Sequence, residues 1–238
     1  MSKFIILAIA RSGSTSLARV LDESKDVKMA IEPFNPDYTT WYPDEPNYSA
    51  QVKDEESLDR VADELFTRFT AIKTLNYQLD TELYEHLMLR SSLKIILLYR
   101  KNVVESVLSA EIGKQTNAWH KNELNDAAIN AYSQLKPVDL SSIQKHIDFI
   151  SSQHSELLDF LHVNKANEFI ELNYEGLYSE DSDKNVQTIT RICEFLDVSV
   201  PNTKHIDKYM KVSGSKVNSR KQLEMIPNFG EISKKFGL

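Results

Sequence analysis

The sequence contains one cysteine, Cys193, among 238 residues, so no disulfide can form within the chain. The lack of a disulfide framework is typical of proteins from a reducing compartment. No apolar run reaches the roughly 18 residues that a membrane-spanning helix needs. The first apolar run, residues 4–10, follows a lysine, as a signal-peptide core does, but leads into Arg11 without a small-residue cleavage site. We therefore expect a cytoplasmic protein with a buried first strand over residues 4–10.

Positive charge is also scarce, because 28 Lys and Arg residues face 35 Asp and Glu residues and the formal net charge is −7. Such an acidic protein has no general attraction for nucleic acids or anionic membranes. We expect no nucleic-acid partner and no integral membrane segment, and any anion site must be a local cluster of positive groups. Apolar residues make up 41% of the chain, which is ordinary for a globular enzyme.

The hydrophobic pattern predicts an α/β domain with a mostly parallel central sheet flanked by helices. Apolar runs predict strands over residues 4–10, 70–75, 93–99 and 168–173. Apolar residues at helical spacing predict helices over residues 15–21, 54–69, 140–161 and 183–196. Right-handed crossovers then bring the loops that follow the strands to one carboxyl edge, where ligands bind in such sheets. Pro137 predicts a break between two helices. We expect a single domain, residues 1–238, with a helical hairpin over about 120–162.

A short loop rich in hydroxyl groups follows the first strand. Its residues are Arg11, Ser12, Gly13, Ser14, Thr15 and Ser16. A strand, a turn and a helix in this order aim backbone N–H groups and a helix N-terminus at an anion, and four hydroxyls with an arginine exceed what a helix cap needs. The ATP-binding loop has a second glycine followed by lysine, which this loop lacks. We predict an anion site, with a Mg-ATP kinase as the alternative.

With its neighbours this loop reads A-R-S-G-S-T-S-L and resembles the 5′-phosphosulfate loop of the sulfotransferases, P-R-S-G-S-T-x-L, with Ala10 in place of proline. The resemblance implies a P-loop-like α/β fold. It also implies 3′-phosphoadenosine 5′-phosphosulfate (PAPS) as sulfuryl donor, adenosine 3′,5′-bisphosphate (PAP) as product, and no metal. It assigns the six loop residues to donor binding. Arg11 stands where the family has a lysine and is also a catalytic candidate.

Three further segments resemble the family in the same order along the chain. Arg100 ends a predicted strand and resembles the 3′-phosphate motif together with Ser109, with Ser106 as the alternative serine. Residues 172–198 resemble a Tyr-Glu-x-Leu segment and the helix after it. We expect Tyr174 and Glu175 of this segment to be structural. Residues 213–232 resemble a basic loop that closes over the donor and an Ile-x-Asn-aromatic-x-Glu signature. The donor-binding candidates in this loop are Lys216, Ser219 and Arg220.

The candidate base is Glu32, in a Glu-Pro-Phe stretch that resembles bacterial carbohydrate sulfotransferases, where this glutamate is the proposed base. Pro33 disfavours helix at Glu32 and predicts an extended or turn geometry there. The cytosolic branch of the family has a Lys-Thr-His base motif, but this chain has leucine after Lys73 and Thr74. A histidine base therefore does not carry over, and Lys73 is a candidate contact for the sulfuryl group. The resemblance implies a carbohydrate, glycolipid or small-molecule hydroxyl as acceptor.

Three residues are substrate-side candidates. Trp119 and His120 resemble a segment of the same bacterial branch, in which the indole could stack on a sugar and the imidazole could serve as an alternative base. Trp41 belongs to an aromatic, irregular segment, residues 36–53, that either lines a substrate cleft or is pinned to the surface by ring burial. A catalytically inactive relative that only binds PAPS or PAP remains an alternative, and the acceptor and the oligomeric state stay open.

Overall fold

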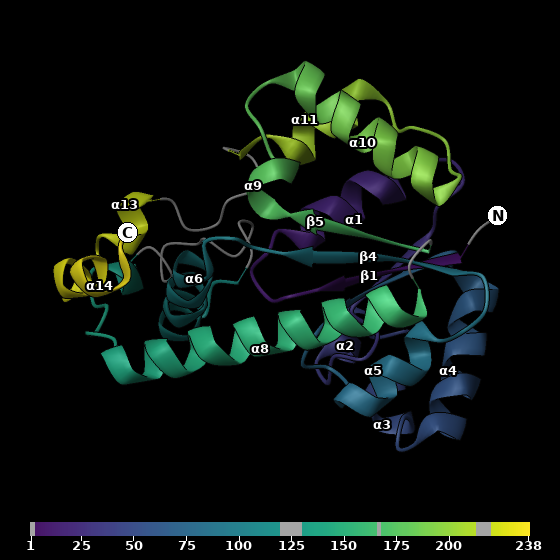
Figure 1. Ribbon diagram of the computed structural model, residues 1–238, viewed down its shortest axis with the longest axis horizontal. Helices are drawn as coiled ribbons and strands as arrows, with labels where there is room; N and C mark the ends of the chain where they lie inside the picture. The colour runs from purple at the N-terminus through teal and green to yellow at the C-terminus, as the bar shows by residue number, and fades with distance from the viewer. Residues whose placement is uncertain (1–2, 120–129, 166–167, 213–219) are drawn as a thin grey trace.

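The computed structural model describes residues 3–119, 130–165, 168–212 and 220–238. A parallel sheet with the strand order β2-β3-β1-β4-β5 runs through its centre (Figure 1). The strands are β1 (Lys3–Ala8), β2 (Met29–Ile31), β3 (Ala71–Leu75), β4 (Leu93–Tyr99) and β5 (Phe169–Asn173). The predicted α/β class with a central parallel sheet flanked by helices is confirmed.

Two details of the sheet differ from the prediction. β1 ends at Ala8 instead of residue 10, because Ile9 only donates to the carbonyl of Leu98 before the chain turns into the loop. β2 is missing from the prediction, since three residues are too few for a periodic signal. This short strand pairs with β3 in a register that puts Ile31 opposite Lys73. It therefore brings Glu32, the next residue, to the end of β3.

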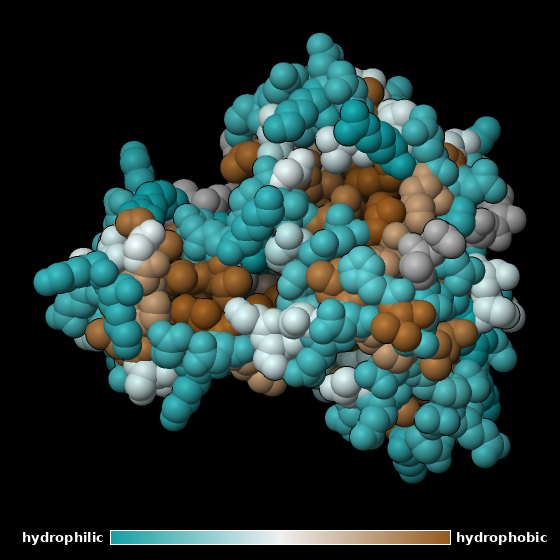
Figure 2. Space-filling model, in the orientation of Figure 1, coloured by the Kyte–Doolittle hydropathy of each residue, from teal (hydrophilic) through white to brown (hydrophobic). Residues whose placement is uncertain are grey.

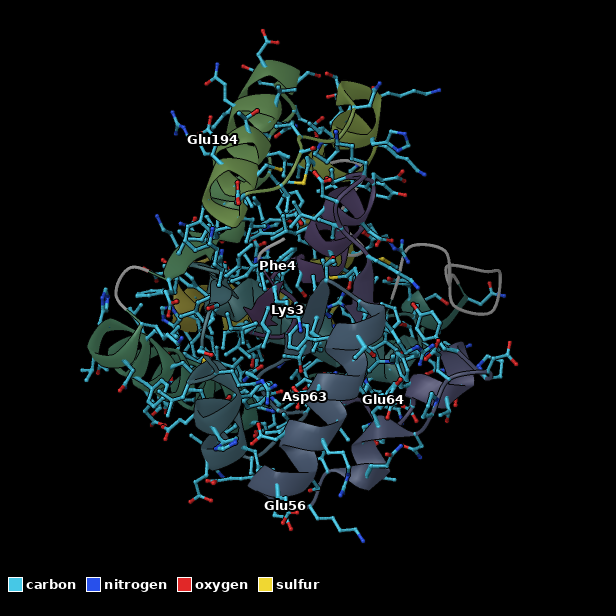
Figure 3. The ribbon with its side chains drawn as sticks, turned by 90° about the vertical axis from the view of Figure 1, so that its right-hand side faces the viewer. Lys3, Phe4, Glu56, Asp63, Glu64 and Glu194 are labelled. Atoms are coloured by element: carbon cyan, nitrogen blue, oxygen red, sulfur yellow. The ribbon has the colours of Figure 1, made fainter. Side chains whose placement is uncertain are left out.

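Helices cover both faces of the sheet (Figure 1). One face carries α1 (Ser14–Asp22), α10 (Ser182–Leu196) and α11 (Thr203–Met210), and the other carries α4 (Glu55–Arg68), α5 (Thr81–Met88) and α8 (Leu140–Asn164). Alternate residues of β1 serve the two cores, with Phe4 in the first and Ile5 in the second. Figure 3 looks from the amino ends of the strands and shows Phe4 between α10, which carries Glu194, and α4, which carries Asp63.

A third apolar cluster lies beyond the carboxyl ends of the strands, where α6 (Val103–Thr116), α13 (Arg220–Leu223) and α14 (Phe229–Phe236) meet the first half of α8 (Figure 1). Figure 2 shows apolar atoms gathered between α14 and α8. Asn228 of the predicted signature accepts from the N–H of Val138 at 3.0 Å and donates to its carbonyl at 2.8 Å. This double hydrogen bond ties the C-terminal segment to the start of α8. Residues 120–129 of the expected hairpin and 213–219 of the expected closing loop lie outside the described residues.

The aromatic segment 36–53 contains two single-turn helices, α2 (Tyr38–Trp41) and α3 (Tyr48–Gln51). Tyr38 and Tyr48 are buried in the second core, so ring burial pins the segment to the molecule. Trp41 and Tyr42 are 46% and 40% exposed. The expected pinning by ring burial is therefore present, and the lining of a substrate cleft by this segment stays a prediction. Within the described ranges, no helix has the length and apolar character that a membrane crossing requires.

Candidate functional site

The hydroxyl-rich loop after β1 forms the start of α1. Gly13 is the N-cap residue with φ of 85°, and no side chain caps the helix. Its carbonyl accepts from Ser16 N–H at 3.0 Å and from Tyr178 Oη at 2.6 Å. Ser12 is fully buried, and its Oγ has no hydrogen-bond partner in the described part of the chain. A helix start leaves its first N–H groups without helical partners. An uncapped start beside a buried, unpartnered hydroxyl fits an anionic ligand.

The close contact between Gly13 and Tyr178 predicts that Gly13→Ala destabilises the fold by about 1–3 kcal/mol. A Cβ at Gly13 would lie 2.7 Å from Cε2 of Tyr178, and the positive φ disfavours any side chain. Urea unfolding measures the loss. Gly230→Ala is the matched control, because a Cβ there meets nothing within 4 Å and no loss is expected. Equal stability of Gly13→Ala and the wild type would contradict this packing.

Arg11 links the loop to α6. Its Nε and Nη2 donate to Ser109 Oγ at 3.2 and 3.1 Å, and its Nη1 donates to the carbonyl of Trp119 at 2.8 Å. The guanidinium lies 5.9 Å from the centre of the Trp119 ring. The spacing pattern paired Ser109 with Arg100, whereas the structure places Ser109 against Arg11. The reason is that α6 leads away from the end of β4 and passes the loop after β1.

Two side chains fix the entry of this loop. Ser106 of α6 donates to the carbonyl of Ala10 at 2.9 Å, and Asn76 Oδ1 accepts from the N–H of Ala10 at 3.3 Å. Ser106 therefore supports the loop backbone directly. Asn76 stands directly after β3 at the same edge of the sheet, and sequence reasoning missed it because one asparagine after a strand carries no specific signal.

Arg100 ends β4 and is only 7% exposed. Its Nη2 donates to Glu105, its guanidinium lies 4.7 Å from the centre of the Tyr174 ring, and its Nε lies 3.8 Å from Glu175 Oε1. The Glu175 carboxylate also accepts from the N–H groups of the two residues after Arg100, at 3.0 Å each. The buried Nε has no hydrogen-bond partner among the described residues, which fits a further anionic ligand.

Tyr174 and Glu175, which the sequence analysis left out of the site, therefore hold Arg100 in place. They begin α9 (Tyr174–Leu177), directly after β5. Because β5 neighbours β4 in a parallel sheet, residues after both strands meet at one edge. That topology was the signal that could have identified them.

Glu32 and Lys73 form a buried ion pair at the same edge. The Lys73 ammonium donates to Glu32 Oε1, and the Glu32 N–H donates to the Lys73 carbonyl at 2.7 Å. Glu32 is 6% exposed and Lys73 is 1% exposed. The chain bends at Glu32 with φ of 60°, so the residue is not extended, and the turn before Pro33 aims its carboxylate at β3.

The electrostatics of this pair follow from burial and mutual attraction. Burial raises the pKa of Glu32, but the charge of Lys73 and hydrogen bonds from Lys73, Asn35 and Gln78 outweigh it and hold the pKa below its ordinary value. Burial lowers the pKa of Lys73, Glu32 opposes that effect, and the charge of Arg11 adds to it. Glu32 is therefore a carboxylate at neutral pH, and Arg11 couples the pair to the loop.

For the remaining candidates, the structure gives no contact with Arg11, Glu32 or Lys73 among the described residues. Arg220 of α13 donates to Glu224 at 3.0 Å and lies 4.7 Å from the centre of the Phe229 ring. Trp41 lies exposed on α2. His120, Lys216 and Ser219 lie outside the described residues. In the described ranges, no group of three or more His, Cys, Asp or Glu residues could hold a metal ion.

The carboxyl edge of the sheet therefore combines two features. One is a loop whose uncapped helix start fits an anion, with Arg11 in it and Arg100 across the edge. The other is a buried carboxylate with an ammonium beside it. A group carried by an anionic donor can be held by the first feature while the carboxylate accepts a proton from an incoming hydroxyl.

Comparisons with known proteins identify the family and the fold. The family model described as "Sulfotransferase domain" matches residues 1–235. No curated protein matches the chain. A crystal structure of a sulfotransferase from Alicyclobacillus acidocaldarius is similar in fold, with a TM-score of 0.52 and 18% identity over 100% of this chain and 92% of that chain.

Two other solved structures are more distant. Mouse sulfotransferase SULT7A1 complexed with PAP gives a TM-score of 0.47 and 16% identity over 92% of this chain and 68% of that chain. The sulfotransferase domain from the curacin biosynthetic pathway gives a TM-score of 0.48 and 13% identity over 99% of this chain and 97% of that chain.

Proposed function

Because the chain belongs to the sulfotransferase domain family, we propose that it transfers a sulfuryl group from PAPS to a hydroxyl of a carbohydrate, glycolipid or small-molecule acceptor. The observation that carries this proposal is the buried Glu32–Lys73 ion pair beside the loop of Arg11. A carboxylate, an ammonium and a guanidinium at one edge are the groups that this transfer needs.

The loop and Arg100 would hold the two ends of the donor. The loop residues 11–16 would bind the 5′-phosphosulfate through backbone N–H groups, hydroxyls and Arg11. Arg100 would bind the 3′-phosphate through its buried guanidinium. Ser109 or Ser106 of α6 would be the second contact, although in this structure Ser109 accepts from Arg11 and Ser106 donates to the Ala10 carbonyl. The unpartnered Ser12 Oγ and Arg100 Nε both support this assignment. PAPS supplies an activated sulfuryl group whose leaving group is the phosphate of PAP.

The chain's own groups would then assist the attack. Glu32 accepts the proton of the acceptor hydroxyl while the hydroxyl oxygen attacks the sulfur atom of the donor. Lys73 and Arg11 stabilise the negative charge on the oxygens of the transferring group and of the leaving phosphate. As in phosphoryl transfer, positioning and charge stabilisation supply most of the catalysis. His120 is the alternative base.

The acceptor side is assigned from resemblance and position. The Glu-Pro-Phe stretch around Glu32 favours a carbohydrate, and Trp119, which lies against Arg11, is the candidate to stack on a sugar. Trp41 is a second candidate because it is exposed on α2. Lys216, Ser219 and Arg220 are proposed to close over the donor.

The test is transfer of ³⁵S from labelled PAPS to a disaccharide, a glycolipid and a phenol, each with and without EDTA. We expect a labelled carbohydrate product whose rate does not depend on EDTA. Labelling of the phenol alone would overturn the preference for a carbohydrate and leave sulfuryl transfer to a small-molecule hydroxyl in place. No labelled product from any acceptor, together with PAP binding, would favour the inactive relative.

A further inference from the structure

Gln78 contacts the carboxylate of Glu32 and has a fixed orientation. Its Oε1 accepts from Thr74 Oγ1 at 2.9 Å and from the N–H of Leu75 at 3.1 Å. Two donors on one atom identify that atom as the carbonyl oxygen, so the amide nitrogen must be the other atom. This nitrogen donates to Glu32 Oε2 at 2.7 Å. The end of β3 thus aims a hydrogen-bond donor at the candidate base.

Asn35 repeats this arrangement from the other side. Its Oδ1 accepts from the N–H of Asp37 at 3.0 Å, which fixes the amide in the same way. Its Nδ2 donates to the same carboxylate oxygen, Glu32 Oε2, at 3.0 Å. Two amides from different segments therefore converge on one oxygen atom.

The two oxygens of Glu32 are consequently unequal. Oε2 accepts two hydrogen bonds, and an ionised carboxylate offers about two acceptor sites on each oxygen. Among the described residues, Oε1 accepts only from Lys73. One acceptor site on Oε1 therefore has no partner among the described residues, next to the ammonium of Lys73.

We propose that Gln78 and Asn35 are positioning residues that occupy Oε2, keep Glu32 ionised and leave Oε1 as the atom that takes the proton of the acceptor hydroxyl. The inference rests on the proposed role of Glu32 as base. It assigns a function to two residues that contact neither donor nor acceptor and act through Glu32. Lys73 then sits beside the same oxygen that receives the proton.

Charged and titratable groups of several elements surround Glu32. Lys73 of β3, Tyr77 after β3 and Tyr42 after α2 interact electrostatically with Glu32, and Arg11 acts on Lys73. Burial raises the pKa of both tyrosines. Asp22 interacts with Tyr42 and Asp37 with Tyr77. A titration followed at the carboxyl carbon of labelled glutamate reports on Glu32 and not on these two aspartates.

The experiment is a ¹³C NMR titration of protein labelled at glutamate Cδ, between about pH 3 and pH 8, in the presence of PAP. The signal that Glu32→Gln removes identifies Glu32. Asn35→Asp keeps the contact to Asp37 N–H, replaces one donor by a negative oxygen and adds no labelled carbon. Gln78→Met removes the other donor. We expect each variant to move the Glu32 midpoint upward by about one pH unit.

Asn164→Asp is the matched control, because it adds the same charge at the exposed C-terminus of α8, near the amino edge of the sheet. The titration midpoint of Glu32 in this variant should equal that in the wild type. An unchanged midpoint in Asn35→Asp and Gln78→Met, with PAP still bound, would overturn the inference. If Gln78→Met does not fold, the Glu32 midpoint in Asn35→Asp alone tests the inference. Full activity of Glu32→Gln would instead overturn the base assignment, whatever the midpoints show.

Discussion

Replacing Glu32 by glutamine should lower kcat for sulfuryl transfer by about 100- to 10,000-fold, the usual contribution of a general base. The glutamine cannot take the proton of the acceptor hydroxyl. If its carbonyl oxygen accepts from Lys73, its amide nitrogen faces the donors of Gln78 and Asn35, and the buried ammonium loses its counter-charge. The variant should therefore be less stable than the wild type, whereas PAP, which lacks the transferred group that Lys73 would contact, should bind the folded variant with little change in affinity. Steady-state transfer of ³⁵S from PAPS measures the loss, and calorimetric titration with PAP measures the affinity.

The control for Glu32→Gln is Glu56→Gln, which removes the same charge from the exposed start of α4, at the end of that helix that lies away from Phe4 of β1 (Figure 3). We expect wild-type kcat for it. If Glu32→Gln kept full activity, the base would have to be another residue, with His120 the first to replace. If it lost PAP affinity as well, Glu32 would be a binding residue instead.

Replacing Arg100 by alanine should weaken PAP binding by about 10- to 150-fold, corresponding to about 1.5–3 kcal/mol for hydrogen bonds to a charged group. The variant loses the buried guanidinium at the proposed 3′-phosphate site. It also leaves Glu105 and Glu175 without the cation that they share, so two carboxylates would face the phosphate. Calorimetric titration of each variant with PAP measures the change.

Lys101→Ala is the neighbouring control, because Lys101 is exposed and its N–H contact to Glu175 comes from the backbone. It should bind PAP like the wild type. The 3′-phosphate assignment also predicts that adenosine 5′-phosphosulfate, which lacks that phosphate, binds both Arg100→Ala and the wild type with similar affinity. An Arg100→Ala variant that binds PAP as tightly as the wild type would contradict the assignment.

Much of the fold was predictable because buried parallel strands and amphipathic helices have strong periodic signals. Residues 93–99 match β4, and the helix expected over 140–161 extends to Asn164. The miss at β2 arises because its three residues are defined by pairing with β3, which is a tertiary interaction. The motif around Gly13 was predictable for a different reason, since only glycine suits a backbone with φ of 85° packed against Tyr178.

The site was predictable in its residue types but not in its contacts. Glu32 and Lys73 were chosen separately from local motifs, and the structure brings them together as an ion pair through the β2–β3 register. The sequence grouped Ser109 with Arg100 as one motif, and the contact of Ser109 with Arg11 could not be predicted because helix spacing does not say which strand end a helix passes. Gln78 carries no motif, and its role depends on Thr74 and Leu75 fixing its amide.

Calorimetric titration of the wild-type protein with PAP and, separately, with Mg-ATP tests most directly that the loop after β1 belongs to a PAPS-dependent enzyme. The loop has no lysine after a second glycine, and its partner across the edge is the buried Arg100. We therefore predict saturable binding of PAP without added metal and much weaker binding of Mg-ATP. Tight binding of Mg-ATP with no binding of PAP would contradict the assignment of the donor and place the loop among kinases.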